Sequence, residues 1–307
     1  MARHVIESEA HWLAMREPNV GGSDVASLLD CGFKTRFQFW NEKKGRLPPE
    51  DYSDNERVTL GRCLEAGIAR AAEELYGIEL EKSNAYYTDD ACPGLGATLD
   101  YCLLSGRGFC PVEVKNASWG QWRDNWITHE DGTVEPPLRY LLQVQTQLAC
   151  TGASTGMLIA LISGDRLVKC DIPRHEEAIA EIRRRVREFW DSIAEGREPE
   201  PNLPRDLEYM KVVWGAGEGS VDLSGDPDME PWLEQIAALR ANIKAFENEK
   251  ATIEGRVLDY CVKNGYATVK AHAGRVSVKT TPAKKKRMVE YGAQPEKISM
   301  RITVAHE

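Results

Sequence analysis

The segment CPVEVKNAS, residues 110–118, places a carboxylate and an amine two positions apart within an apolar run. Successive side chains of a strand point to opposite faces, so a strand here would turn Glu113 and Lys115 to one face. Val112 and Val114 would then face the core. An isolated E-x-K pair is common and by itself indicates only a weak surface ion pair. The chemistry of this pair therefore depends on what the rest of the chain places beside it.

Asp100 supplies a second carboxylate, on the segment GATLDYCLL, residues 96–104. This segment is predicted to be a strand that forms a hairpin with residues 109–115 through the turn SGRG. Two adjacent carboxylates repel each other unless a cation lies between them, and oxygen ligands suit Mg²⁺ or Mn²⁺. The carbonyl of Val114 would add a ligand, and Lys115 would lie near a metal-bound water that faces a phosphorus atom. The predicted chemistry is hydrolysis of a phosphodiester.

Composition limits the other classes of function. With 307 residues, 42% of them hydrophobic, the chain is long enough for one main domain and an appendage. No apolar run reaches the length of a membrane span, and MARHVIESEA lacks the apolar core of a signal peptide, so we expect a cytoplasmic protein without membrane contact. The eight cysteines form no CxxC pair, and the six histidines are isolated, which argues against disulfides, a zinc ribbon and a histidine-rich metal site.

The net charge of −9 is unevenly distributed. Residues 270–297 contain eight Lys or Arg against two Glu, a local charge of +6, which leaves −15 for the rest of the chain. Within this segment the run KKKR, residues 284–287, is predicted either to bind DNA phosphates or to be a solvated charge run. A basic segment in an acidic chain is compatible with a nucleic-acid partner.

The helices expected before the hairpin are marked by their end signals. A short helix is predicted in NVGGSDVASLLD with Ser23 or Gly22 at its N-cap, and a second helix is capped by Thr35 and stopped by Gly45. Residues 55–76 are predicted to form an amphipathic helix with Glu65 beside its apolar face. The residues expected on that face are Leu60, Leu64, Ile68, Ala71 and Leu75.

After the hairpin, a helix is predicted in PPLRYLLQVQTQLACTG, followed by two apolar strands and a helix at about residues 175–195. Residues 197–228 are predicted to be a linker or an extended surface loop. Residues 229–307 are predicted to form a helical and β-hairpin appendage that carries the basic segment. Its helix has apolar residues in alternating steps of four and three, broken by Lys250, which is typical of a surface that packs on another helix. These are Trp232, Ile236, Leu239, Ile243, Phe246, Ile253, Val257 and Tyr260.

These motifs together resemble a known family. GATLDY followed by VEVK resembles the PD-(D/E)xK nucleases, with Leu99 in place of the usual proline. MREPNVGGSD near the N-terminus, LGRCLE on the helix before the strands and YLLQVQTQL on the helix after them narrow the resemblance to lambda-exonuclease-like enzymes, the YqaJ-type viral recombinases. The resemblance covers about residues 10–195. It implies an α/β, restriction-endonuclease-like core over residues 1–196, with a central mixed sheet flanked by helices.

The resemblance also implies roles for single residues. Asp100 and Glu113 are expected to bind two metal ions, Mg²⁺ or Mn²⁺, with the Val114 carbonyl as a further ligand. Lys115 is expected to orient or activate the attacking water. Glu65 corresponds to the family's additional acidic residue near the metal site, although without the motif it would be an ordinary helix glutamate.

Further residues match the family around these groups. Gln143 corresponds to the glutamine beside the catalytic lysine, and Tyr140 to a supporting aromatic residue nearby. Arg16 and Ser23 correspond to a pair that holds a 5′-phosphate, and Thr98 is expected to add a hydroxyl. The physical chemistry agrees with this expectation, because a guanidinium chelates phosphate and a serine at a helix N-terminus adds a hydroxyl beside free amides.

The function implied by the resemblance is that of an exonuclease in phage-type recombination. Such an enzyme degrades one strand of linear double-stranded DNA 5′ to 3′ to 5′-mononucleotides and leaves a 3′ overhang. Family members form homotrimeric rings and work beside a single-strand annealing protein.

Two other functions remain open. One is a nuclease of the same core with the other polarity or with internal cleavage. The other is a catalytically silent DNA-binding scaffold, which is disfavoured because Asp100, Glu113 and Lys115 are all present. A hydrolase with Ser23 as nucleophile is weaker still, since GGSD is not a GxSxG elbow.

Overall fold

The VEVK segment lies in the middle of a five-stranded mixed sheet in the computed structural model, which describes residues 1–51, 54–105, 108–215, 219–281 and 297–304. The central pair, β6 and β9, is parallel, and the other pairs are antiparallel. Parallel neighbours need a long crossover, which residues 118–154 provide. In sheet order the strands are β10 (Arg166–Pro173), β9 (Thr155–Ile162), β6 (Gly108–Ala117), β5 (Tyr101–Ser105) and β2 (Glu81–Lys82).

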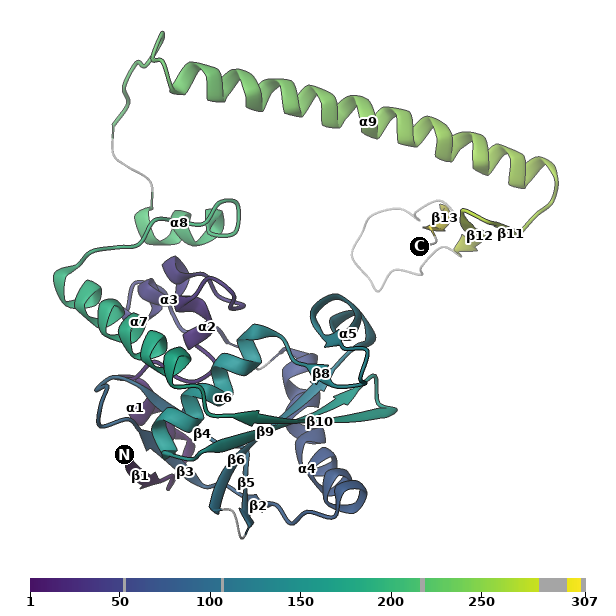
Figure 1. Cartoon of the computed structure of the whole chain (residues 1–307). Helices are drawn as coiled ribbons and strands as arrows, with labels where there is room; N and C mark the ends of the chain where they lie inside the picture. The colour runs from purple at the N-terminus through teal and green to yellow at the C-terminus, as the bar shows by residue number, and fades with distance from the viewer. Residues whose placement is uncertain (52–53, 106–107, 216–218, 282–296, 305–307) are drawn as a thin grey trace, which may run out of the picture. The chain divides into compact units, whose positions relative to one another are not determined.

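Helices cover both faces of this sheet (Figure 1). α4 (Glu56–Tyr76) packs on one face, where Ile68 and Val114 belong to one apolar cluster. α6 (Leu138–Thr151) packs on the other face and α7 (Glu176–Glu195) packs against α6. This architecture confirms the predicted α/β core with a mixed sheet flanked by helices. A strand covered on both faces buries every side chain along its middle, and Glu113 is accordingly only 2% exposed.

A second sheet lies beside the first and consists of β1 (Ala2–Val5), β3 (Ala85–Thr88) and β4 (Gly96–Thr98). The sequence predicted a single strand over residues 96–104, but the structure divides it at Leu99 and Asp100, so that β4 and β5 belong to different sheets. The first of these strands, β4, packs closely on β3, and only a glycine fits at position 96. A Cβ there would lie 2.3 Å from the Tyr86 hydroxyl of β3. The break places Asp100 at the junction between the two sheets.

The shorter elements complete this body: α1 (Glu9–Arg16), α2 (Val25–Leu28), α3 (Arg36–Lys43), α5 (Trp119–Asn125), β7 (Ile127–Thr128) and β8 (Val134–Glu135). Thr35 caps α3 as predicted, since its hydroxyl accepts the backbone N–H of Gln38 at 3.0 Å. The predicted N-cap of α2 was wrong. Asp24 holds that position and makes no side-chain capping bond, because its carboxylate is bound by Arg16 instead.

The predicted apolar face of α4 was also wrong in part. Leu60, Leu64 and Leu75 are 55%, 39% and 69% exposed, whereas the buried side chains are Ile68, Ala69 and Ala72. The helix meets the sheet through Ile68 and two alanines; the alanines permit a close approach, and the leucine stripe is turned toward solvent.

The first compact unit runs from Met1 to Gly217 and includes α8 (Leu207–Trp214), which lies in the stretch that the sequence predicted as a linker. Asp206, at the N-cap of α8, is fully buried and accepts hydrogen bonds from the Thr35 hydroxyl at 2.5 Å and the Asn202 N–H at 2.7 Å. Arg205 donates to the Phe33 carbonyl at 2.6 Å. These bonds attach the start of α8 to the residues around α3.

The second unit, Glu218–Glu307, contains α9 (Met229–Lys263) and an antiparallel sheet of β11 (Thr268–Ala271), β12 (Gly274–Thr281) and β13 (Lys297–Val304). The predicted helix and strand pair are present, and β13 adds a strand that the sequence did not indicate. The run KKKR, residues 284–287, lies outside the described residues. Within the described part of the chain, no helix has the length and apolar character that crossing a membrane requires.

Candidate active site

Glu113 is the centre of the site, because three side chains donate to its buried carboxylate. Lys115, its neighbour on the same face of β6, and Gln143 both donate to Oε1, the latter at 2.6 Å. Gln147 donates to Oε2 at 2.6 Å. Hydrogen bonds to a charged acceptor are the strong ones, and together these fix the carboxylate in one orientation. We call Asp100, Glu113, Lys115, Gln143 and Gln147 the carboxylate cluster.

Helix α6 provides both glutamines of this cluster. Gln143 and Gln147 are four residues apart and therefore lie on the same face of the helix. The intervening Gln145 faces elsewhere, since it donates to the Pro173 carbonyl at 2.8 Å and accepts from the His175 N–H at 2.9 Å. The sequence identified Gln143 and missed Gln147. The i, i+4 spacing within QVQTQ was the signal that could have found it.

Asp100 reaches β6 from the break between the two sheets. Its carboxylate accepts the backbone N–H of Val114 at 2.8 Å. The pairing of β5 with β6 ends at Tyr101 and Val112, so the carboxylate takes the position that an extension of β5 toward its N-terminus would have filled. The N–H and C=O of one strand residue point to the same side, so the Val114 carbonyl also faces this gap. The structure thus places the Asp100 carboxylate against β6 at Val114, next in the strand to Glu113.

Burial and mutual charge dominate the electrostatics of the cluster. Burial, and then the charge of Glu113, raise the pKa of Asp100 well above its ordinary value. Burial alone would lower the pKa of Lys115, but Glu113 and Asp100 together raise it. Lys115 is therefore an ammonium donor, and its Nζ lies 5.3 Å from the ring centre of Tyr140, the predicted supporting aromatic residue.

The donor chemistry of this place fits a divalent cation. Two carboxylates and a main-chain carbonyl are hard oxygen ligands, and a cation between the carboxylates would relieve the repulsion that raises the pKa of Asp100. Glu65 lies on the α4 side and is ion-paired with Lys82 at 2.7 Å. Among the residues that the structure describes, no three or more His, Cys, Asp and Glu side chains form a metal-binding group, so the structure does not place Glu65 in one.

A second group of polar side chains forms around Arg16. Its guanidinium lies 3.2 Å from the Asp24 carboxylate and 4.7 Å from the ring centre of Trp12. Trp12 in turn donates to the Thr98 hydroxyl at 2.9 Å. We call Trp12, Arg16, Asp24 and Thr98 the arginine cluster. The sequence predicted Arg16 and Thr98 but missed Trp12 and Asp24, and Ser23, the expected partner, is exposed one residue before the N-cap of α2.

The two clusters adjoin. Gln147 donates to the Thr98 carbonyl at 3.3 Å, and a Cβ on Gly22 would lie 3.4 Å from the Gln143 side chain. A Cβ on Gly21 would lie 2.9 Å from the Asp24 carboxylate, so a larger residue there would displace that group. The adjacent glycines let the loop before α2 pack directly on α6.

Lys43, on α3, holds the C-terminal end of α1 in place. Its ammonium donates to the carbonyls of Arg16 and Asn19 at 2.9 and 2.8 Å, and burial lowers the pKa of Lys43. A cation at the C-terminal end of a helix compensates the unpaired carbonyls there. This contact holds the backbone from which the Arg16 side chain extends.

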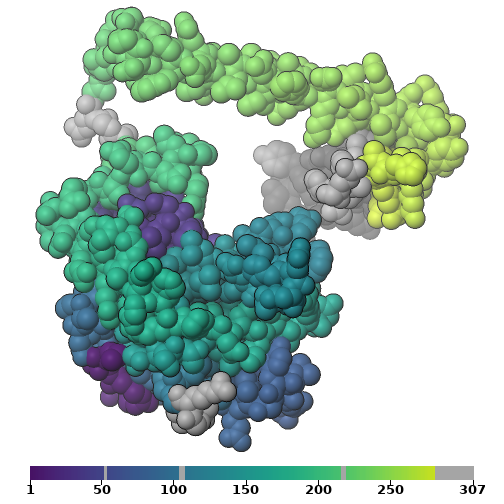
Figure 2. All heavy atoms as spheres, viewed as in Figure 1, coloured from purple at the N-terminus to yellow at the C-terminus, as the bar shows by residue number. Residues whose placement is uncertain are grey.

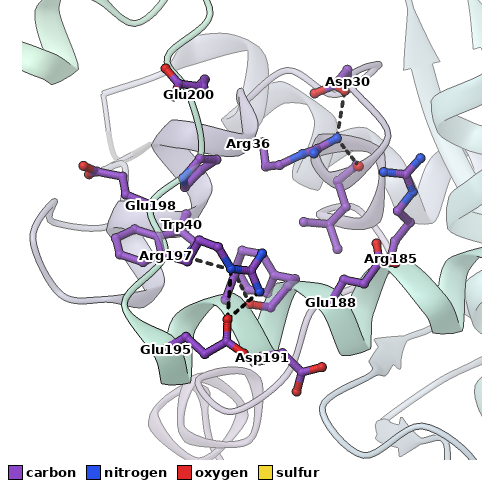
Figure 3. A pocket seen from close by; sticks show the side chains of 14 residues that line it. Asp30, Arg36, Trp40, Arg185, Glu188, Asp191, Glu195, Arg197, Glu198 and Glu200 are labelled. Carbon is purple, nitrogen blue, oxygen red and sulfur yellow. Dashed lines mark hydrogen bonds and ion pairs between the residues drawn. The ribbon is translucent and has the colours of Figure 1, made fainter.

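A cavity of about 680 Å³ lies elsewhere in the first unit, between α3, α7 and the segment after α7 (Figure 3). Its three arginines are already paired: Arg36 with Asp30 at 2.8 Å, Arg185 with Glu181 at 2.8 Å and Arg197 with Glu195 at 2.6 Å. None of the predicted site residues lines it. The cavity is therefore separate from both clusters.

Comparisons with known proteins agree with the motif reading. Residues 11–154 match the YqaJ-like viral recombinase domain. One similar solved structure is an alkaline exonuclease, LHK-Exo, from Laribacter hongkongensis, which has also been solved in complex with dAMP. It has a TM-score of 0.48 and 23% identity, and the match covers 66% of this chain and 96% of that chain. A phage related exonuclease from Haemophilus somnus has a TM-score of 0.41 and 12% identity, covering 58% of this chain and 96% of that chain. The chain matches no curated protein.

Proposed function

We propose that the protein is a magnesium-dependent deoxyribonuclease, a nuclease role that the match of residues 11–154 to the YqaJ-like viral recombinase domain supports. It degrades one strand of linear duplex DNA from the 5′ end and releases 5′-mononucleotides. The remaining 3′ overhang is the substrate for strand annealing in phage-type recombination.

The burial of Glu113 is the observation that carries this proposal. A surface E-x-K pair would be solvated, whereas Glu113 is 2% exposed and accepts from Lys115, Gln143 and Gln147. Burying a charged pair beside a second carboxylate is costly, and such costs are typical of functional sites. Hydrolysis of a phosphodiester accounts for every member of the cluster.

The residues divide the work as follows. Asp100, Glu113 and the Val114 carbonyl would hold Mg²⁺, which when bound polarises the scissile phosphate and lowers the pKa of the attacking water. Lys115 donates a hydrogen bond and neutralises negative charge that develops on the phosphate. Gln143 and Gln147 keep the Glu113 carboxylate oriented while substrate enters. The Tyr140 ring supports the ammonium of Lys115.

The arginine cluster supports cleavage from a 5′ end. A guanidinium binds phosphate through charge-assisted hydrogen bonds, and Arg16 lies in the group that adjoins the carboxylate cluster through Gln147. A terminal phosphate held by Arg16 would place the next phosphodiester toward Glu113. The same reasoning predicts an exonuclease rather than an enzyme that cuts internally.

The family resemblance further motivates a ring of three copies around duplex DNA and an annealing protein as partner. These remain proposals about assembly.

The test uses linear duplex DNA with either a 5′-phosphate or a 5′-hydroxyl, labelled at the 3′ end of each strand in turn. With Mg²⁺ we expect mononucleotides, progressive loss of the 5′-phosphorylated strand and slower loss of the 5′-hydroxyl strand, and with a chelator no products. Early release of the 3′ label would indicate the opposite polarity, and internal fragments would indicate an endonuclease. DNA binding without cleavage in Mg²⁺ and in Mn²⁺ would contradict the nuclease and favour the scaffold.

A further inference from the structure

Helix α9 exposes almost all of its apolar side chains. It has 35 residues, of which only Cys261 is buried, and it extends about 52 Å at 1.5 Å per residue. Ile243 and Phe246 are 56% and 67% exposed. In Figure 2 the helix is the long green rod that ends at the yellow strands of the second unit. A helix of this kind gains most of its stability by packing its apolar stripe on a partner.

The exposed stripe follows a seven-residue repeat, which we call the α9 seam. In this repeat the a positions are Ile236, Ile243, Lys250 and Val257. Three of these four residues are β-branched, as is common at the a positions of parallel coiled coils. The d positions carry larger side chains: Trp232, Leu239, Phe246, Ile253 and Tyr260.

Lys250, the polar residue in the seam, specifies the partner's chemistry. A single Lys at an a position lowers stability but fixes register and the number of strands. In a parallel, in-register pair, the a position lies beside the preceding g position of the other helix, which in this chain is Glu249. Each Lys250 would therefore meet the Glu249 of the second copy. Within its own helix Lys250 also lies 3.7 Å from Glu254, which keeps the ammonium at the edge of the seam.

An antiparallel pair would lose this complementarity. There a positions oppose d positions, which would set Lys250 against Phe246 and bring the two Glu249 side chains together. A foreign helix of unrelated sequence would have no reason to supply an acid at this one position.

We propose that α9 pairs in parallel with α9 of a second copy of this chain, in register along the seam. The pairing joins two chains through their second units and does not depend on the nuclease assignment. The seam thus makes the protein at least a dimer, whatever assembly the first unit forms.

The first test compares Ile243→Glu, at an a position, with Asn248→Glu, which adds the same charge on the opposite side of α9. In full-length protein measured by light scattering, we expect Ile243→Glu to lower the particle mass by a factor of about two and Asn248→Glu to leave it unchanged. Equal masses for Ile243→Glu and the wild type would overturn the proposal, as would a monomeric wild type, in which the seam covers another part of its own chain.

The second test uses variants whose effect cannot arise from misfolding. Lys250→Leu should hold the assembly together at about tenfold lower protein concentration, because an apolar residue replaces the charge in the seam. Leu239→Cys should form a disulfide-linked dimer on mild oxidation, since identical positions face each other only in a parallel pair. The wild type, oxidised in the same way, is the control for cross-links through its own cysteines. Assembly without the Leu239→Cys cross-link would overturn the parallel register, and weaker assembly of Lys250→Leu would overturn the pairing.

Discussion

The carboxylate cluster and the arginine cluster adjoin, yet they are held in place by different means. Glu113 is 2% exposed and receives three donors, so its position is determined several times over. The guanidinium of Arg16 belongs to a side chain that is 32% exposed, and it has one carboxylate and one ring beside it. The first arrangement is rigid and costly, which is what the proposed action on a reacting phosphate would require. In the second, the proposed phosphate would replace Asp24 beside Arg16.

The largest expected effect would come from Lys115→Met, which keeps the aliphatic stem over Tyr140 and removes the ammonium. Cleavage of linear duplex DNA should fall about a thousandfold or more, because the cluster acts as a unit. Lys169→Met is a matched control: Lys169 also pairs with an acid two residues away on a strand, at 3.1 Å, and lies over a tyrosine ring. Comparable loss in both variants would contradict the role of Lys115.

Gln147→Leu tests whether a rigid Glu113 matters. The substitution removes the donor to Oε2 and the bond to Thr98, and we expect cleavage to fall about thirtyfold with DNA binding kept, in line with the loss of a supporting group. The control Gln145→Leu lies on the same helix and loses bonds to Pro173 and His175, so it should lower thermal stability and leave cleavage at permissive temperature within about twofold. Full activity of Gln147→Leu would show that two donors suffice.

A smaller effect is expected in the arginine cluster. Arg16→Ala should reduce the preference for a 5′-phosphate over a 5′-hydroxyl about tenfold, the value of one charge-assisted interaction, without changing cleavage of 5′-hydroxyl ends. Arg70→Ala removes an exposed guanidinium paired with Glu74 at 3.4 Å and serves as the control. If wild type and Arg16→Ala discriminate equally, the phosphate binds elsewhere.

The smallest effect concerns stability and its dependence on pH. Because burial and Glu113 raise the pKa of Asp100, the cost of its ionised form is fully present above that raised pKa and disappears as the pH falls toward the ordinary carboxyl range. In chelator at neutral pH, Asp100→Asn should therefore raise the unfolding temperature by about 3 °C, and the gain should shrink on acidification. Asp171→Asn, at an exposed carboxylate of β10, should change neither. A lower unfolding temperature for Asp100→Asn would mean that the ionised Asp100 carboxylate is stabilised by more than its hydrogen bond from Val114 and its attraction to Lys115.

The features that the sequence predicted correctly are those that depend on hydrophobic periodicity and on the residues that begin and end helices. The bounds of α6 and α7, the Thr35 cap and the pairing of β9 with β10 follow from local patterns, and the convergence of Asp100 and Glu113 followed from a hairpin. The break at Leu99 and Asp100 could not be predicted, because it arises where the chain leaves the sheet of β3 and β4 and joins the sheet of β5 and β6, and no local pattern marks that change of partner. The face of α4 was misjudged because Ile68 and two alanines, and not the leucines, meet the sheet. The role of Asp24 could not be predicted, since nothing local shows that a guanidinium eight positions earlier would bind it.

The glutamine donors to Glu113 also have a consequence for when the site comes into being during synthesis. They stand 30 and 34 positions further along the chain, and the parallel neighbour of β6 is completed later still. A nascent chain that ends before α6 holds Glu113 and Lys115 in a strand with nothing to cover that face. Closing such a long connection is slow compared with forming a hairpin. If the carboxylate cluster is the active site, as we propose, it is complete only once the crossover has docked, and incomplete chains leave the ribosome without it.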